Sequence, residues 1–280
     1  MGDLAVDTAV EGVGEGHFTA ELSRDWEIWG PMGGYVASVA LRAAGESSPF
    51  ERPASFSCHY LGVASFDVVD IAVTTLRQAR TAASHRVEVT QGGKPMLEAT
   101  VWSVGQVEGL THDATEAPAV PSPEETPTIQ ELLSEEELEA GPPFPFWNNV
   151  ESRAVEFVHP WPPTEPLDPV WQAWCRFSPT PTFDDPWVDA CRSVILIDVQ
   201  SWPAAHRPHA YLDPPFYAPS LDLYAAFHDP RPQSDWLLTD GYGPIARDGL
   251  MGWTGRLWAR DGALVASGGG QLLCRRVPQR

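Results

Sequence analysis

Basic residues are scarce in this sequence. Its 280 residues include 18 Lys and Arg against 38 Asp and Glu, which gives a formal net charge of −20. Nucleic acids and anionic membranes select surfaces rich in Lys and Arg, so this balance disfavours both as partners. Ten of the acidic residues lie between Gly105 and Ala140, a segment without Lys or Arg. The rest of the chain is therefore less acidic and leaves room for an anionic ligand.

Cysteine is also rare, and its spacing matters as much as its number. The four cysteines are far apart and form no Cys-x-x-Cys pair: Cys58, Cys175, Cys191 and Cys274. A disulfide framework or a zinc site would require a different pattern. We expect buried thiols, no metal and no cofactor.

Long hydrophobic runs are missing too. No stretch approaches the ~18 uninterrupted apolar residues of a membrane helix. Residues 1–16 are acidic, whereas a secretory signal has basic residues before a long apolar core. We expect a cytoplasmic protein that does not insert into membranes, and its 43% hydrophobic content suits a globular core.

Familiar hydrolase and nucleotide-binding motifs are absent. The sequence has no Gly-x-Ser-x-Gly elbow, no His-Glu-x-x-His and no Walker loop. Gly12, Gly14 and Gly16 follow no predicted strand, so they do not indicate a Rossmann fold.

Two similar hairpin patterns are present instead. In Ser84–Val104 and again in Gly252–Leu273, an alternating strand meets a tight turn and a second alternating strand follows. Each pattern closes a half of the chain that contains a helical segment. The sequence therefore predicts a duplicated α+β unit, with the functional site between the halves.

Each half is expected to contain one helix and an antiparallel sheet. The first helix, Tyr35–Ala44, is entered through Gly33 and Gly34 and is expected to end at Gly45. The strands expected around it are His17–Leu22, Ser55–Gly62, Asp67–Leu76, His85–Gln91 and Met96–Val104.

The second half begins after an acidic, Pro-rich connector with one surface helix, Thr128–Ala140. Asp185 and the following proline predict the start of the second helix, Trp187–Val199. The strands expected in this half are Trp171–Ser178, Tyr217–His228, Trp236–Tyr242, Gly249–Arg260 and Ala263–Arg275.

Four motifs, in order along both halves, resemble those of the acyl-CoA thioesterase II (TesB-like) family: Trp29–Tyr35, Thr75–Pro95, Ser220–His228 and Asp261–Gln271. Members of this family carry two hotdog domains in one chain. The resemblance implies an α+β double hotdog in which two long helices are each wrapped by an antiparallel sheet. The implied domains are an N-terminal hotdog at 1–104, an acidic linker at 105–145 and a C-terminal hotdog at 146–280.

The resemblance also implies a function in lipid metabolism. It predicts a thioester hydrolase that converts fatty acyl-CoA to free acid and CoA, and a homo-oligomer, a dimer of double hotdogs. Two alternatives remain open: a non-catalytic acyl-CoA or lipid-binding double hotdog, and a hotdog enoyl-CoA hydratase. The hydratase would need an Asp/His pair at the helix entrance, and Gly30–Tyr35 contains neither residue.

A catalytic trio that positions water is the family's characteristic site. The matching residues here are Asp198, Ser220, which stands where the best-known members have Thr, and Gln271. Family spacing would place the glutamine at Gly270. One residue's slip changes the face of a strand, so a bulge among the neighbouring glycines would be needed to turn Gln271 inward.

Each residue of the trio also has a structural alternative. Asp198 follows four apolar residues, and desolvation there would raise its basicity, yet it could instead bond nearby backbone or Ser193. Gln271 either faces solvent or orients the water. Ser220 either caps a strand start or bonds the same water.

The entrance to the first helix is the predicted substrate-binding site. Free N–H groups at Gly33, Gly34 and Tyr35 can polarise a thioester carbonyl, although glycines there also permit close packing. Tryptophans are candidates for an acyl pocket or for the core: Trp26, Trp29 and Trp147. Cations available for CoA phosphates are Arg77, Arg80, Arg86, Lys94, Arg247, Arg256, Arg275 and Arg276.

Overall fold

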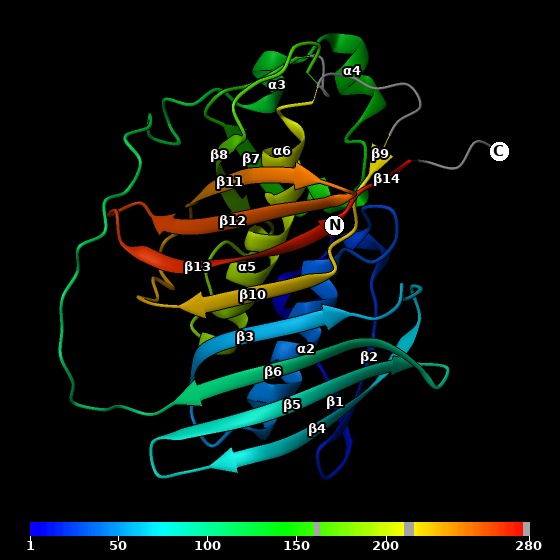
Figure 1. The fold of residues 1–280 in the computed structure, drawn as a ribbon, viewed down its shortest axis with the longest axis vertical. Coiled ribbons are helices and arrows are strands. Elements are labelled where there is room, and N and C mark those ends of the chain that lie inside the picture. The colour runs from blue at the N-terminus through cyan, green and yellow to red at the C-terminus, as the bar shows by residue number, and fades with distance from the viewer. Residues whose placement is uncertain (160–162, 210–215, 277–280) are drawn as a thin grey trace.

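One antiparallel sheet of twelve strands organises the computed structural model, which describes residues 1–159, 163–209 and 216–276 (Figure 1). The first half contributes β1 (Glu11–Gly14), β2 (His17–Glu21), β3 (Arg52–Tyr60), β4 (Val68–Gln78), β5 (Ala82–Gln91) and β6 (Lys94–Val104). The second contributes β7 (Val150–Ala154), β8 (Val170–Phe177), β10 (Asp222–Phe227), β11 (Leu237–Arg247), β12 (Leu250–Ala259) and β13 (Leu264–Leu273).

The strand order shows the duplication directly. It runs β1-β2-β4-β5-β6-β3-β10-β13-β12-β11-β8-β7, so the halves meet where β3 pairs with β10. Outward from this seam, β6, β5 and β4 on one side correspond to β13, β12 and β11 on the other. In the seam, Leu223 lies opposite Cys58 and Ala225 opposite Phe56. The predicted double α+β unit is confirmed.

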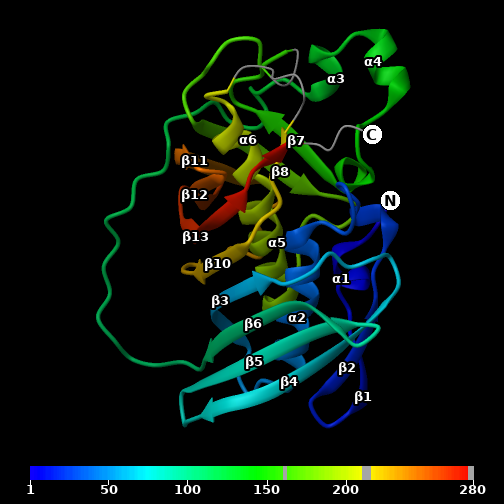
Figure 2. The ribbon, with the colours of Figure 1, turned by 45° about the vertical axis from the view of Figure 1, so that its right-hand side comes forward.

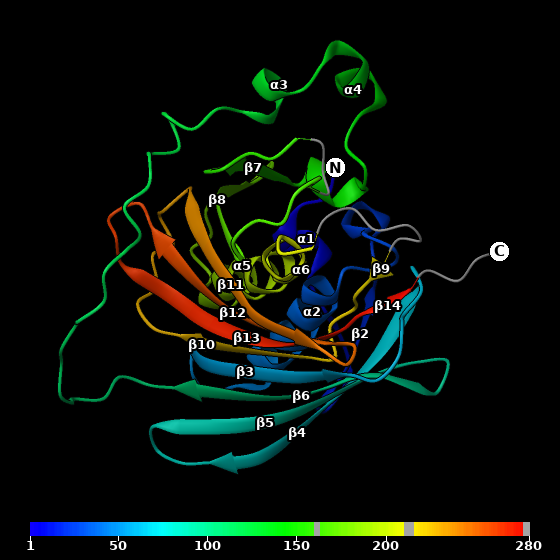
Figure 3. The same cartoon turned by 45° about the horizontal axis from the view of Figure 1, so that its top comes forward.

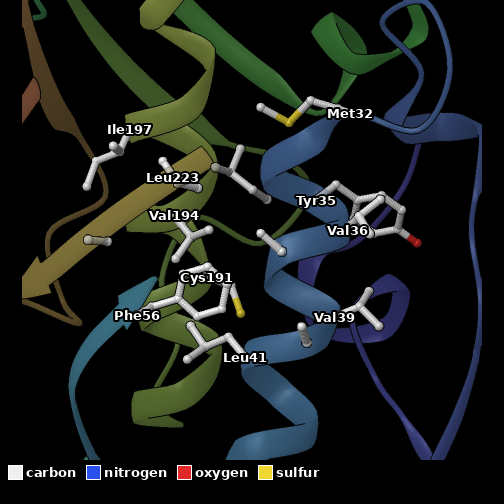
Figure 4. Packing of buried hydrophobic residues seen from close by; sticks show 14 of the residues in the cluster. Met32, Tyr35, Val36, Val39, Leu41, Phe56, Cys191, Val194, Ile197 and Leu223 are labelled. Atoms are coloured by element: carbon white, nitrogen blue, oxygen red, sulfur yellow. The ribbon is translucent and has the colours of Figure 1, made fainter. Parts of the chain in front are cut away.

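Two long helices cover one face of the sheet. They are α2 (Gly33–Ser47) and α5 (Pro186–Val199), and the sheet curves around them and the short α6 (Ser201–His206) (Figures 2 and 3). Their facing side chains are apolar and buried, which drives the packing. Figure 4 shows Val194 and Cys191 of α5 directed toward α2.

Both predicted hairpins form. In β5–β6, Gln91 pairs with Lys94, leaving a two-residue turn in which Gly92 and Gly93 have φ of 56° and 74°. Positive φ at both positions is the mirror-image turn that matches strand twist, and glycine adopts it without strain. The β12–β13 turn likewise has Gly262 at φ 83°.

The first helix does not end at Gly45 as predicted. It continues through Gly45 to Ser47, and a Cβ at Gly45 would lie 2.7 Å from the Trp187 ring of α5. This glycine therefore permits a close approach between the two helices rather than terminating one of them.

The predicted connector helix is in fact two. These are α3 (Ile129–Leu132) and α4 (Glu135–Ala140), each opened by its own capping box: Thr128 with Glu131, then Ser134 with Glu137. The second box starts a new helix where the sequence pattern suggested one continuous element.

The strand predicted at Tyr217–His228 is divided. Its first residue, Tyr217, belongs to β9 (Phe216–Tyr217), which pairs with β14 (Arg275–Arg276), while β10 begins later, at Asp222. Further short elements were not predicted: α1 (Leu4–Asp7), η1 (Arg24–Trp26), η2 (Pro145–Asn148), α6, β1 and β7.

The acidic linker passes along the outside of the second half before reaching α3 and α4 (Figure 1). The Trp174 indole donates to the Pro121 carbonyl (2.8 Å), and Arg260 pairs with Glu124 (2.6 Å). These contacts lie beside a small outer cluster of buried apolar residues: Trp174, Trp236, Leu238 and Trp258.

All four cysteines are free thiols, three of them buried and Cys274 half-buried. Within the described ranges, no helix is both long and apolar enough to cross a membrane.

Candidate active site

The carboxylate of Asp198 joins the two halves of the molecule. It lies in the last turn of α5 and is only 7% exposed. Its Oδ2 accepts from the backbone N–H of Gly34 in α2 (2.7 Å), and its Oδ1 accepts from the Ser220 hydroxyl (2.8 Å). The predicted alternative partner, Ser193, is not used.

This geometry follows from how the helices end. The N-cap residue of α2, Met32, provides no side-chain cap, so the first amides of the helix need an acceptor from elsewhere. The carboxyl end of α5 brings Asp198 to that position, where the partial positive charge of the helix N-terminus favours an anion. Asp198 thus caps a helix in the other half of the chain.

Opposing effects determine the pKa of Asp198. Burial raises the pKa above its ordinary value, and this is the largest effect. The hydrogen bonds from Ser220 and from the Gly34 amide act in the opposite direction, because they stabilise the ionised form. The group is a carboxylate made more basic by desolvation and held in place by two donors.

The glycines at the start of α2 allow this approach. A Cβ at Gly34 would lie 2.9 Å from Cα of Ile195 and 3.0 Å from Cβ of Asp198. A Cβ at Gly33 would lie 3.0 Å from Oδ2 of Asp198. Among the described residues, the Gly33 N–H donates to no acceptor. The glycines therefore permit close packing and also leave one amide available.

Ser220 is fixed by the strands around it. It forms an isolated bridge with Leu272, and the neighbouring Leu221 donates its N–H to the carbonyl of Gln271 (2.8 Å). Pro219, on the other side, accepts from Leu273 N–H (2.9 Å). The end of β13 thus holds the hydroxyl against Asp198.

The structure does not bring the Gln271 carboxamide to this pair. Gln271 is exposed, its neighbour Leu272 is buried, and its side-chain nitrogen lies 3.4 Å from where a Cβ on the cross-strand Gly252 would be. The β12–β13 register is continuous from Ala266 to Leu273, so no bulge among the glycines turns the side chain inward. The expectation of an inward Gln271 is therefore not met.

A side chain at Gly270 would not complete the trio either. A Cβ there would lie 2.8 Å from Oδ1 of Asp222, and that carboxylate accepts from the Gln271 backbone N–H (2.8 Å). The backbone of this segment therefore has no room for an amide side chain at the position that the family spacing indicates.

Tyr35 lies apart from the carboxylate. Its hydroxyl donates to the Asp7 carbonyl (2.8 Å) and accepts from Ser23 N–H (3.0 Å), and its ring stacks on Trp26 at 5.4 Å. In Figure 4 the ring extends from the side of α2 away from α5. Tyr35 is a core residue that anchors the start of the helix.

Tyr60 is the polar residue near the site that sequence reasoning missed. Its hydroxyl is buried, and a Cβ at Gly33 would lie 3.2 Å from that oxygen. It occupies the same face of β3 as Phe56 and Cys58, both of which are buried. That alternation in the sequence is a signal that places the Tyr60 side chain on the inward face of the strand, although it does not show what the hydroxyl faces.

Aromatic side chains surround the approach to α2. Trp29, 55% exposed, makes edge contacts with Phe144, Trp202 and Tyr217 at 6.2–6.4 Å. By contrast, Trp26 is fully buried in the core and Trp147 packs on Phe146. Of the three candidate tryptophans, Trp29 is the one at the surface.

Two of the candidate cations lie beside this aromatic group. Arg275 pairs in β14 with Tyr217, and Arg276 follows it. Arg86 is engaged by Glu88 and Glu98, and Arg256 is 3.6 Å from Asp240.

Comparison with known proteins agrees with this architecture. Residues 22–104 match the acyl-CoA thioesterase N-terminal domain and residues 114–271 the acyl-CoA thioesterase C-terminal domain. The acyl-CoA thioesterase II TesB2 of Mycobacterium marinum is 21% identical, with a TM-score of 0.79 over 98% of this chain and 99% of that one.

Two further solved structures have the same fold. The tesB protein of Mycobacterium avium subsp. paratuberculosis is 22% identical, with a TM-score of 0.78 over 98% of each chain. A hot dog fold protein from Alicyclobacillus acidocaldarius is 18% identical, with a TM-score of 0.80 over the full length of both chains. The chain belongs to the acyl-CoA thioesterase family and is a thioester hydrolase with the double hotdog fold.

Proposed function

We propose that this protein hydrolyses fatty acyl-CoA to free acid and CoA, with Asp198 as the base that activates water. The observation that carries the proposal is the buried Asp198 carboxylate, held between the Gly34 amide and the Ser220 hydroxyl. Desolvation makes a carboxylate a stronger base, and the two donors keep it ionised and oriented.

The reaction needs one proton acceptor and one donor to the carbonyl. Water attacks the thioester carbon while Asp198 takes its proton, and the carbonyl oxygen gains the charge. The available Gly33 N–H at the start of α2 is a suitable donor to that oxygen. The tetrahedral intermediate then breaks its C–S bond, and the leaving thiolate takes the proton from Asp198 to give CoA.

Asp198 and Ser220 position the water in this mechanism, without the Gln271 side chain. The Gln271 carboxamide is exposed, whereas its backbone carbonyl holds Leu221 next to Ser220. Gln271 therefore supports the site through its main chain.

The phosphates of CoA need cations near the same entrance. Arg275 and Arg276 form β14, one residue after the end of β13. They lie along β9 beside Tyr217, whose ring contacts Trp29, four residues before Gly33. We propose that these two arginines hold the phosphates while the aromatic surface contacts the pantetheine or acyl portion.

A free-thiol assay with medium- and long-chain acyl-CoA tests the function. The wild type should release free thiol, whereas Asp198→Asn should bind acyl-CoA but release no thiol. Asp248→Asn, at the exposed β11–β12 turn, is the matched control and should retain full activity. Replacing CoA by N-acetylcysteamine, which lacks the phosphates, should raise KM.

Tight acyl-CoA binding by the wild type without thiol release would support the non-catalytic binding protein instead. Unchanged turnover in Asp198→Asn would place the base elsewhere.

A further inference from the structure

The hydroxyl of Tyr60 is buried next to the site with no oxygen or nitrogen partner among the described residues, and the Cys58 thiol, a weak hydrogen-bonding group, lies beside it. Buried polar groups are nearly always paired, so a lone hydroxyl beside a carboxylate requires an explanation. The ring itself is partly buried and packs against the main core. Its hydroxyl is therefore held in place by packing, and the weakly bonding Cys58 thiol leaves most of its hydrogen-bonding capacity unused.

The surroundings of this hydroxyl indicate what it faces. A Cβ on Gly33 would lie 3.2 Å from the Tyr60 oxygen and 3.0 Å from Oδ2 of Asp198, so both oxygens face the same side of Gly33. The Tyr60 backbone N–H donates to the Leu221 carbonyl (2.9 Å), which places it beside the residue after Ser220. Four groups thus lie close together: Tyr60 of β3, Asp198 of α5, Ser220 just before β10, and Gly33 of α2.

We propose that Tyr60 is a catalytic residue whose hydroxyl donates a hydrogen bond to the thioester carbonyl oxygen, alongside the Gly33 N–H. The inference rests on the proposed hydrolysis and adds a donor to it. Tyr60 keeps its proton throughout: water gives its proton to Asp198, the carbonyl oxygen becomes negative, and the phenol stabilises that charge. On collapse the C–S bond breaks and the oxygen returns to a carbonyl.

The protonation state of Tyr60 suits a donor. Burial is the largest effect on the pKa of this phenol and raises it well above its usual value, and the neighbouring Cys58 and Asp198 act in the same direction. The group therefore holds its proton at neutral pH, where a donor to the carbonyl oxygen is needed.

The weakly bonded hydroxyl also predicts how stability and turnover should separate. A buried donor without a strong acceptor destabilises the free protein, and a substrate carbonyl would supply that acceptor. Removing the hydroxyl should therefore leave the melting temperature unchanged or raise it, while turnover falls. A purely structural tyrosine would not behave in this way.

Tyr60→Phe, which removes the hydroxyl and keeps the ring, is the test. With decanoyl-CoA and palmitoyl-CoA as substrates, kcat should fall about 10²-fold, the usual loss for one donor to an oxyanion, with KM within twofold of the wild type. Tyr224→Phe, on an exposed tyrosine of β10, is the matched control and should preserve both constants.

Three results for Tyr60→Phe would overturn the inference: kcat within threefold of the wild type, a higher KM with unchanged kcat, or a loss of turnover matched by a lower melting temperature. If the wild type releases no thiol from any acyl-CoA, the proposed hydrolysis is itself wrong. The wild-type assay shows that failure before any variant is made, so the two cases are distinguishable.

Discussion

The two ends of the α2–α5 pair occupy equivalent positions but differ in chemistry. Counted from the first helical residues, Gly34 corresponds to Trp187, and Gly45 corresponds to Asp198. At one end the Gly34 amide donates to the Asp198 carboxylate. At the other, the Trp187 ring lies against Gly45, so close that a Cβ would come within 2.7 Å. The same geometry therefore carries a polar pair at one end and an apolar contact at the other.

The two helices also differ in how their N-termini are capped. Asp185 caps α5 within its own segment, accepting from Trp187 N–H (2.8 Å) and Val188 N–H (3.3 Å). The start of α2 has no such residue and takes its acceptor from α5. A helix that is already capped has no need of an acid from its partner, so only one end can form a carboxylate site. By helix position, the counterpart of Asp198 in the first helix is Gly45, which has no side chain to offer.

The largest effect should come from removing the charge at the polar end. Asp198→Asn should lower turnover about 10²–10⁴-fold, the usual contribution of a positioned base. It should also stabilise the fold at neutral pH. Because burial raises the pKa of Asp198, the ionised group disfavours the folded state above that pKa.

The stability gain has a defined pH dependence. It should disappear as pH falls below the ordinary pKa of aspartate, where the wild-type residue is protonated in both the folded and the unfolded state. Urea unfolding of both proteins at neutral and acidic pH checks this. A variant less stable than the wild type at neutral pH would mean that the hydrogen bonds outweigh the desolvation.

A substitution at the apolar end should change the stability of the fold and leave turnover unchanged. Gly45→Ala adds a methyl group against the Trp187 ring, and overpacking of this kind typically costs about 1–3 kcal/mol. The better helix propensity of alanine offsets up to about 1 kcal/mol of that cost. We expect a lower free energy of unfolding with kcat unchanged.

Denaturant unfolding and the free-thiol assay measure the two quantities for Gly45→Ala. Glu46→Ala, at the exposed neighbouring position, is the control and should have a small effect on both. A fall in kcat for Gly45→Ala would show that the two ends are coupled through α2.

Much of this asymmetry could be predicted from the sequence, because it depends on local patterns. The Asp185–Pro186 helix start, the paired hairpins and the position of Asp198 after an apolar run all act within a few residues. What could not be predicted depends on the partner segment. The sequence around Gly45 indicates a helix end, and only the structure shows the Trp187 ring against it. The sequence around Tyr60 indicates an ordinary strand residue, and only the structure shows that its hydroxyl lies beside Gly33.

A smaller effect is expected at the second donor to Asp198. Ser220→Ala should lower kcat about tenfold, since the hydroxyl orients the base through one charge-assisted hydrogen bond. That bond lowers the pKa of Asp198, so its loss should raise the pKa further and move the acidic limb of the pH–rate profile to higher pH.

Ser220→Thr keeps the hydroxyl and adds a methyl group that restricts its rotamer, so it should retain activity and an unshifted acidic limb. An unshifted limb in Ser220→Ala as well would mean that Asp198 is not the group whose ionisation is observed.

The smallest effect is expected at Gln271. Its carboxamide lies on the exposed side of β13, and its contributions to the site are a backbone carbonyl that holds Leu221 and an N–H bound by Asp222. Gln271→Ala retains both main-chain groups, so kcat should stay within twofold of the wild type in the free-thiol assay. A loss of tenfold or more would contradict the pairing of β12 and β13 in the working enzyme, because the side chain can reach Asp198 only if the strand shifts by one residue. A kcat within twofold thus indicates a site built from Asp198 and Ser220 alone, whereas a tenfold loss of kcat indicates a trio that Gln271 completes after the strand shifts.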